Sequence, residues 1–241
     1  MCGRIVQVMS PDDVAAAMDA VLEPGFGADP AWAPRWNLPP SSLASIVTPN
    51  DGGRRLERAV WGLPGGKEGH ARSLFNARAE TVDRLPSFRE PFRTGRVLVP
   101  VDAFYEWENP EHLAMGGKGT APAGRRQPWA FLPAREPLLA LAGISARVVT
   151  ADGEAIRAFS LITTEANGVV GAIHDRMPVI VEREAFDRWL DPTTDRADLF
   201  PMLGPAPDDR LAARRVSTAV SNARNEGPAL LEEVAAEPRL F

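Results

Sequence analysis

The stretch Arg96–Trp107 reads RVLVPVDAFYEW, and it decides the class of fold. Its first half contains Val97–Val101, a short valine-rich run that is typical of a buried strand. Its second half places Glu106 between two aromatic residues. An acid in such surroundings is expected to lose contact with water, which raises its pKa and suits it to donate a proton. A strand-end glutamate in an ordinary salt bridge is the alternative.

Similar short runs recur on both sides of this stretch. Asp152-Gly153 predicts a hairpin turn between two of them. Many strands with few helices favour an α+β fold, which we expect to be a single domain with a mixed, barrel-like β core and peripheral helices. The predicted strands are Leu43–Thr48, Leu56–Trp61, Trp129–Leu132, Leu138–Leu141, Ala146–Thr150, Ala155–Thr163, Val179–Val181 and Arg215–Ala219.

Three segments predict the peripheral helices. The first begins at Ser10, a good N-cap residue before a proline, and its apolar face continues to Leu22. It ends at Pro24-Gly25. Thr164–Ile173 and Glu182–Leu190 are the other two predicted helices.

Length and composition are those of an ordinary globular protein. The chain has 241 residues, of which 44% are hydrophobic and 24% charged. We expect one domain over residues 1–241, with an irregular insertion at about 109–128 that is rich in glycine. One cysteine excludes a disulfide framework, and three scattered histidines give no zinc-ligand spacing. We therefore expect neither a metal nor a cofactor.

Charge and hydropathy restrict the partners. No stretch reaches the roughly 20 apolar residues that span a bilayer, and the N-terminus lacks a secretory signal, so we expect a cytoplasmic protein without membrane contact. A net charge of −5 argues against a uniformly basic protein for duplex DNA. Only two of the 27 basic residues are lysines. Arginine suits bidentate phosphate contacts, although a GC-rich genome produces the same bias.

Cys2 directly follows the initiator methionine. Methionine aminopeptidase removes Met1 when the second residue is small, and the mature chain then begins with a cysteine. Its α-amine, with an ordinary pKa of about 7.7–8.0, is partly neutral at pH 7 and attacks aldehydes to give a Schiff base. The adjacent thiol then closes a five-membered thiazolidine ring. An incidental cysteine after the start codon is the alternative.

Two further clusters carry side chains that suit the same chemistry. Asn76 offers hydrogen-bond donors and an acceptor, and Arg78 presents a fork for phosphate, although both also fit a helix start with a surface arginine. His174 lies beside an acid and a base, shortly before Pro178. A histidine in such a loop suits acid–base work, with a structural histidine as the alternative.

Taken together and in order, these segments resemble the SOS response-associated peptidase family of abasic-site-processing proteins. Any one motif is weak, but the ordered set is specific and covers nearly the whole chain. The matching segments are Met1–Arg4, Arg35–Asn37 with Pro40, Trp61–Leu63, Asn76–Thr81, Pro100–Trp107, Phe159–Thr164, His174–Pro178 and Val216–Pro228.

The resemblance implies a function in the DNA damage (SOS) response. Cys2 is implied to cross-link to abasic sites in single-stranded DNA, after a Met1 removal that the family's name suggests is autocatalytic. Asn76 is implied to position the cysteine and the opened sugar, while Glu106 and His174 transfer protons in this lyase-type chemistry. The implied DNA contacts are Arg4, Pro40, Arg78, Thr163 and Arg176. We expect a monomer and no proteolysis of other proteins.

Three departures from the family pattern concern DNA contact. The stretch Pro64–His70 lacks the aromatic residue that usually follows, Ala103 replaces a glycine, and Ala142–Ser145 lacks a tryptophan. Losing one stacking residue costs about 1–3 kcal/mol per base contact. The DNA affinity or junction preference of this chain is therefore expected to differ from that of the family.

Two other functions remain open on the sequence alone. The first is a cysteine-type peptidase that uses Cys2 and His174, which turnover of a peptide without DNA cross-linking would favour. The second is a non-covalent DNA-binding module, which predicts salt-sensitive binding with no covalent adduct.

Overall fold

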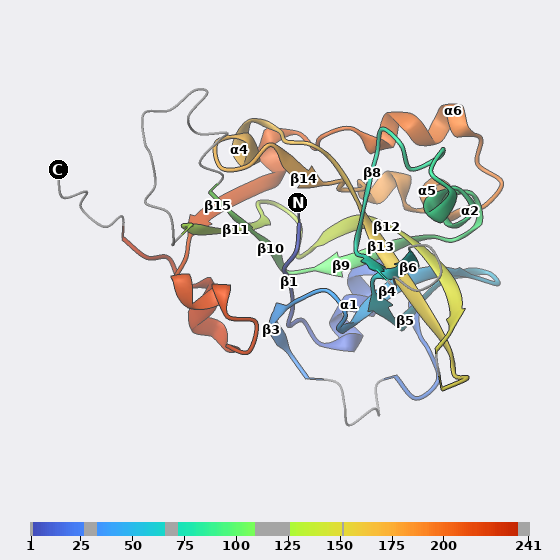
Figure 1. Cartoon of the computed structure of the whole chain (residues 1–241), viewed down its shortest axis with the longest axis horizontal. Helices are drawn as coiled ribbons and strands as arrows, with labels where there is room; N and C mark the ends of the chain where they lie inside the picture. The colour runs from blue at the N-terminus through green and yellow to red at the C-terminus, as the bar shows by residue number, and fades with distance from the viewer. Residues whose placement is uncertain (1, 27–32, 66–71, 109–125, 151, 236–241) are drawn as a thin grey trace.

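Five strands close into a barrel at the centre of the protein (Figure 1). The computed structural model describes residues 2–26, 33–65, 72–108, 126–150 and 152–235. Antiparallel neighbours run in the order β13, β12, β9, β4, β5, and a parallel pairing of β5 with β13 completes the ring. The five strands are β4 (Leu43–Asn50), β5 (Gly53–Trp61), β9 (Arg96–Val101), β12 (Leu139–Val149) and β13 (Ala155–Glu165).

A second, five-stranded sheet packs against the barrel. One apolar cluster contains side chains of all five barrel strands together with Ile5, Phe104 and Phe131 of the second sheet. The opposite face of that sheet, with Val6 and Tyr105, packs against the C-terminal segment. Its strands, in spatial order, are β15 (Leu211–Arg215), β11 (Pro128–Pro133), β10 (Ala103–Trp107), β1 (Ile5–Gln7) and β3 (Arg35–Leu38).

Short strands and helices complete the fold. The remaining strands are β2 (Val21–Leu22), β6 (Leu63–Gly65), β7 (Arg72–Leu74), β8 (Asn76–Arg78) and β14 (Arg176–Pro178). The α-helices are α1 (Pro11–Met18), α2 (Pro86–Thr94), α4 (Gly168–Gly171), α5 (Phe186–Leu190) and α6 (Arg196–Leu199). Five 3₁₀ turns are η1 (Arg183–Ala185), η2 (Phe200–Leu203), η3 (Asp208–Arg210), η4 (Thr218–Ser221) and η5 (Pro228–Leu231). The expected α+β class, with a barrel-like core and peripheral helices, is confirmed.

The stretch that decides the fold connects the two sheets. It forms β9 of the barrel and β10 of the second sheet, with only Asp102 between them. The Asp102 carboxylate accepts hydrogen bonds from the backbone N–H of Val8, at 2.7 Å, and of Met9. These bonds attach the turn to the end of β1, and they satisfy a side chain whose burial raises its pKa.

Gln7 joins the sheets a second time. Between β4 and β9 only Val47 and Leu98 pair, so backbone groups on either side need other partners. The Gln7 side chain donates to the carbonyls of Ser45 and Pro100 and accepts from the Ser45 N–H, at 2.8–2.9 Å. β1 is thereby fixed to the barrel, and with it the residues that precede β1.

Two of the three predicted helices need correction. Ser10 caps α1 as expected, but the helix ends at Met18, and Asp19 adopts a left-handed conformation with φ 49°. The chain then forms β2, because the edge of β5 is available for parallel pairing. The predicted helix Thr164–Ile173 shrinks to α4, because β14 pairs with the end of β13 and keeps it extended to Glu165.

Most predicted strands are confirmed, with changed bounds. Leu138–Leu141 and Ala146–Thr150 belong to the one long strand β12, and the turn at Gly153 follows it. Arg215–Ala219 is wrong in place, because β11 pairs with Leu211–Arg215 and a 3₁₀ turn follows. Val179–Val181 contributes only an isolated bridge through Ile180. The chain also forms α2, which was not predicted. Of the predicted insertion at 109–128, residues 109–125 lie outside the described ranges.

The barrel interior contains a buried ion pair. Glu57 lies on the same face of β5 as Ala59 and Trp61. These two residues belong to the apolar cluster that the barrel shares with the second sheet. Its carboxylate accepts a 2.6 Å hydrogen bond from Thr48 and lies 3.2 Å from the Arg157 guanidinium.

Among the described helices, none has the length and apolar character needed to cross a bilayer.

Replacing Glu57 with glutamine is expected to destabilise the fold by about 3 kcal/mol, because it leaves the Arg157 charge without its buried partner. Urea denaturation measures the loss. The matched control is Glu90→Gln, which breaks the exposed Glu90–Arg93 pair on α2 and should leave the free energy of unfolding unchanged. Equal effects of the two substitutions would contradict a structural role for the interior pair.

Candidate functional site

Cys2 lies inside the protein, three residues before the start of β1. Its side chain is fully buried in the apolar cluster shared by the barrel and the second sheet. Burial raises the pKa of the Cys2 thiol, and the nearby charge of Glu106 raises it further. The thiol is therefore neutral at physiological pH, and the Glu106 contribution places that carboxyl within electrostatic reach of the sulfur.

Asn76 holds the backbone of Cys2. Its position is set by β8, which pairs with β13 in parallel so that Asn76 faces Leu161. The Asn76 Nδ2 donates a 2.7 Å hydrogen bond to the Cys2 carbonyl. The Asn76 Oδ1 is buried, and it accepts no hydrogen bond from any residue that the structure describes. An open acceptor therefore lies beside the second residue of the chain.

Glu106 is the most strongly perturbed acid near Cys2. It lies in β10 with 3% of its surface exposed, and burial raises its pKa to about 7, with a smaller contribution from the charge of Asp175. The expected desolvation is confirmed, but the neighbours differ from the expectation. Tyr105 packs on the opposite face of the sheet, whereas Trp129 lies directly opposite Glu106 on β11. Near neutral pH the Glu106 carboxyl can therefore both donate and accept a proton.

His174 follows α4 and precedes β14. Asn167 caps the helix through the N–H of Val170, and the His174 N–H bonds back to the Val170 carbonyl at 2.9 Å. The Arg176 N–H donates to His174 Nδ1 at 2.9 Å, while Asp175 Oδ1 lies 3.0 Å from the same nitrogen. Nδ1 thus has one donor beside it, the Arg176 N–H, and two acceptors, the Asp175 carboxylate and the Arg176 carbonyl at 3.2 Å.

The predicted phosphate ligands Arg78 and Arg176 lie on adjoining strands. Arg78 is exposed at the end of β8. Arg176 begins β14 and donates through both terminal nitrogens to Glu80, and also to the Thr163 carbonyl at 2.6 Å. The hydrogen bond from Arg176 lowers the pKa of Glu80. Thr163 itself is buried, with its hydroxyl 3.4 Å from the Ala77 carbonyl.

Arg4 and Pro40 belong to other parts of the chain than Arg78 and Arg176. Arg4 donates to Asn37 Oδ1 at 2.6 Å and to the Val220 carbonyl at 2.8 Å, and its guanidinium lies 5.6 Å from the centre of the Trp107 ring. Pro40 belongs to the turn between β3 and β4. The residues that flank this turn, Leu38 and Leu43, line a cavity of about 260 Å³.

Asn37 has a role that the sequence did not predict. The residue is fully buried, and its Nδ2 donates to the carbonyls of Val220, Asn222 and Asn225. It therefore fixes the loop after η4 against Arg4. The motif at Arg35–Asn37 was visible in the sequence, but the contact spans more than 180 residues and only the fold brings the two ends together.

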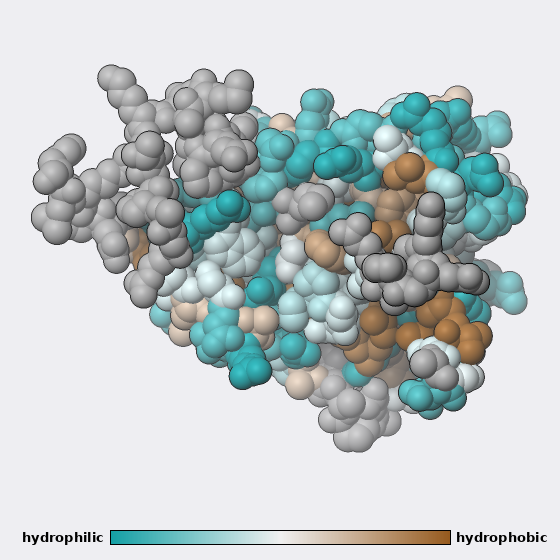
Figure 2. Space-filling model, in the orientation of Figure 1, coloured by the Kyte–Doolittle hydropathy of each residue, from teal (hydrophilic) through white to brown (hydrophobic). Residues whose placement is uncertain are grey.

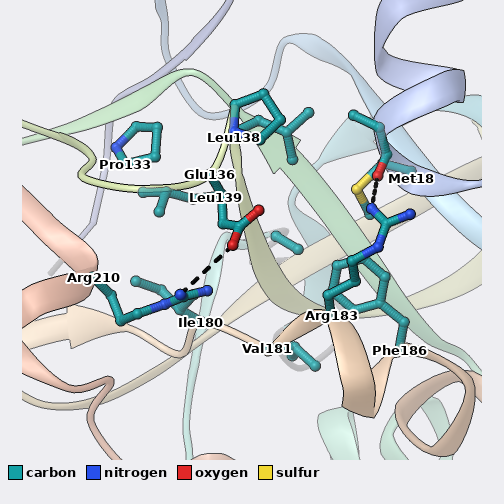
Figure 3. Close-up of a pocket in the computed structure, with 13 residues that line it drawn as sticks. Met18, Pro133, Glu136, Leu138, Leu139, Ile180, Val181, Arg183, Phe186 and Arg210 are labelled. Atoms are coloured by element: carbon teal, nitrogen blue, oxygen red, sulfur yellow. Dashed lines mark hydrogen bonds and ion pairs between the residues drawn. The ribbon is translucent and has the colours of Figure 1, made fainter.

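A second cavity, on the side of the barrel, has a different character. It measures about 40 Å³, and Figure 3 shows apolar walls that include Met18, Ile180 and Phe186, with the Arg210–Glu136 ion pair at its edge. None of the predicted site residues lines it.

The face of the protein that Figure 2 shows is mostly hydrophilic, and its hydrophobic residues gather on the side of the barrel strands. No cluster of three potential metal ligands occurs within the described residues.

Some of the predicted residues lie close to Cys2, which packs between the two sheets. Asn76 contacts Cys2 directly, the charge of Glu106 acts on the Cys2 thiol, and the charge of Asp175 acts on Glu106. Arg176 contacts Thr163 and, through its backbone, His174. β8 and β14 both pair with β13, and β10 pairs with β1 (Figure 1).

Comparison with known proteins identifies the family. A family model described as SOS response associated peptidase (SRAP) matches residues 1–223. The chain belongs to the SOS response-associated peptidase family. This SRAP protein is 32% identical to abasic site processing protein YoqW of Bacillus subtilis strain 168, over 96% of its own length and 99% of that relative. It is 25% identical to YedK of Escherichia coli K12, over 97% and 100% of the two chains.

An animal relative agrees with this membership, and a solved structure shares the fold. Abasic site processing protein HMCES of Xenopus tropicalis is 26% identical, over 95% of the SRAP chain and 77% of the relative. A crystal structure of a protein from Bacteroides thetaiotaomicron superposes with a TM-score of 0.80 at 23% identity, covering 97% and 100% of the two chains. The latter likeness supports the fold alone.

The raised pKa of Glu106 predicts a specific pH dependence of stability. The unfolded chain binds this proton near pH 4.5 and the folded chain near pH 7, so the stabilisation is complete below pH 4.5 and is lost as the pH rises through 7. Between pH 4.5 and 8.5 the wild type should lose on the order of 3 kcal/mol that Glu106→Gln retains. Urea denaturation at both pH values measures this difference. Parallel pH profiles for the two proteins would contradict the buried carboxyl.

Proposed function

We propose that this SRAP protein processes abasic sites by covalent capture, in the DNA damage response. After Met1 is removed, Cys2 begins the chain and cross-links to the aldehyde of an abasic site in single-stranded DNA. The observation that carries the proposal is the hydrogen bond from Asn76 to the Cys2 carbonyl. It holds residue two, whose amine becomes the chain terminus, beside a carboxyl whose pKa lies at about 7.

The chemistry balances without a cofactor or an oxidant. The neutral α-amine of Cys2 adds to the aldehyde carbon of the ring-opened deoxyribose and gives a carbinolamine. The neutral form of Glu106 protonates the departing hydroxyl, which leaves as water. The Glu106 carboxylate then takes back the proton on the iminium nitrogen, and a neutral Schiff base remains. The Cys2 sulfur then adds to the imine carbon, and its proton passes to the imine nitrogen. One C–N and one C–S bond form, and one water is lost.

Burial of the thiol fits this order of events. Since the pKa of the Cys2 thiol is raised, the sulfur stays protonated while the amine reacts, and it supplies the proton that the imine nitrogen needs. His174 is assigned to opening the closed sugar. The Asn76 Oδ1 is an available acceptor for the α-amine or a sugar hydroxyl.

The proposal also assigns residues around Cys2 to contacts with DNA. Arg78 is exposed, and we assign it to a phosphate. Arg176 and Thr163 support the same strands, and Arg4 contacts Trp107 and the C-terminal loop. We assign Arg4 and Arg176 to DNA contacts, and Thr163, which is buried, to holding Arg176 in place. Pro40 is also assigned to a DNA contact. It lies in the turn between Leu38 and Leu43, the two flanking residues that line the cavity.

The arrangement disfavours a cysteine peptidase. Such an enzyme needs a thiolate, which a lowered pKa and a nearby cation provide. Here burial and the charge of Glu106 both raise the pKa of the Cys2 thiol. Autocatalytic loss of Met1 is included in the proposal, whereas turnover of other proteins is not. We further propose that the protein acts as a monomer in the cytoplasm.

Incubation with single-stranded DNA that contains an abasic site, followed by denaturing electrophoresis, tests the covalent step. The wild type should give a retained band, and Cys2→Ala should not, because its amine forms only a reversible Schiff base. Adding borohydride should restore the Cys2→Ala band by reducing the imine. A Cys2→Ala band as stable as that of the wild type, without borohydride, would refute the role of the thiol.

Glu106→Gln is expected to slow cross-linking by about 100-fold at pH 7, the usual contribution of a general acid–base group. Single-turnover measurements at saturating DNA isolate this step from binding. Glu165→Gln, at the exposed end of β13, is the matched control and should cross-link at the wild-type rate. A Glu106→Gln rate within the scatter of that control would remove Glu106 from the mechanism.

A further inference from the structure

A row of three side chains crosses the second sheet and leads away from Cys2. Glu106 on β10 lies directly opposite Trp129 on β11, and Trp129 lies directly opposite Arg215 on β15. Residues opposite each other in antiparallel strands project from the same face. The next row, with Phe104 and Phe131, belongs to the apolar cluster that contains Cys2, so all three side chains face the side of the sheet on which the site lies.

Trp129 is held in a fixed orientation at the edge of this cluster. It is half-buried and packs against the cluster that includes Cys2. Its indole Nε1 donates to Glu108 Oε1 at 3.2 Å, and this bond restricts rotation of the ring. A partly exposed indole with a restricted ring plane is a ready stacking surface for a nucleobase.

Arg215 provides a positive charge at the far end of the row. The side chain is half-buried, and its Nε is buried without a hydrogen-bond partner among the described residues. The preceding residue, Arg214, points to the opposite face and donates to the Leu231 carbonyl at 3.0 Å. Adjacent strands lie about 4.8 Å apart, so the row places Arg215 about 10 Å from Glu106.

We infer that Trp129 and Arg215 extend the single-stranded DNA site beyond Glu106: the indole stacks on a base next to the lesion, and the guanidinium binds the phosphate that follows. This inference rests on the proposed function. It also supplies an aromatic surface to a chain whose stretch Pro64–His70 lacks one. Aromatic residues with interleaved positive charge are the usual means of binding single strands.

Binding of an unmodified single-stranded oligonucleotide to the Cys2→Ala protein, over a range of salt concentrations, tests the inference without the covalent step. Trp129→Leu should weaken binding about 5- to 150-fold at every salt concentration, and Trp129→Phe should recover most of the loss, since it restores a stacking ring. Arg215→Gln should lower the slope of log K against log salt by about 0.7, whereas Arg214→Gln should leave it unchanged.

Three results would overturn the inference: Trp129→Leu binding like its parent, Trp129→Phe binding as weakly as Trp129→Leu, or Arg215→Gln having the salt slope of Arg214→Gln. If the wild type still cross-links abasic DNA in that case, only the assignment of Trp129 and Arg215 is lost. If the binding differences appear but the wild type forms no adduct, only the covalent chemistry is lost.

Discussion

The hydrogen bond between the Asn76 amide and the Cys2 carbonyl places the start of the chain in the interior of the protein. Chain termini usually fray at the surface unless they are tied down. Here β1 is paired on both sides, Gln7 bonds to two barrel strands, and Asn76 holds Cys2, three residues before β1. The proposed reaction requires this constraint, because an amine and a thiol at a mobile terminus would meet the proton-transfer groups only rarely.

The electrostatics of the site follow from the same placement. An acid at the surface would keep a pKa near 4.5, whereas burial of Glu106 beside Trp129 raises its pKa to about 7. Burial also keeps the Cys2 thiol neutral. The free energy of unfolding is therefore lower above pH 7. The same burial makes the Glu106 carboxyl able to transfer protons at neutral pH. The ion pair between Glu57 and Arg157 lies on the barrel's inner face, where it stabilises the fold and takes no part in the proposed reaction.

Local patterns in the sequence predicted the longer strands well and singled out the candidate reacting residues. The runs that became β4, β5, β9, β11 and β13 are short, apolar and bounded by turn residues. Cys2, Asn76, Glu106 and His174 each carry distinctive chemistry beside a recognisable motif. The expected class of fold and the family membership are both confirmed.

The sequence alone could not predict which distant strands and residues pair with one another. The helix after Glu165 is shortened because β14 pairs there, and the strand at Leu211–Arg215 is set by β11. Asn37 and Trp129 likewise matter through partners that are distant in the chain or set by register. No local pattern reports which residue will lie opposite Glu106 on the neighbouring strand.

The intact mass of the purified protein, before and after incubation with abasic single-stranded DNA, tests the central claim most directly. Before incubation, the account predicts a chain that has lost its initiator methionine. Afterwards it predicts one added oligonucleotide less one water, stable to denaturation. A chain that retains Met1, or a demethionylated chain that gains no mass, would contradict the account.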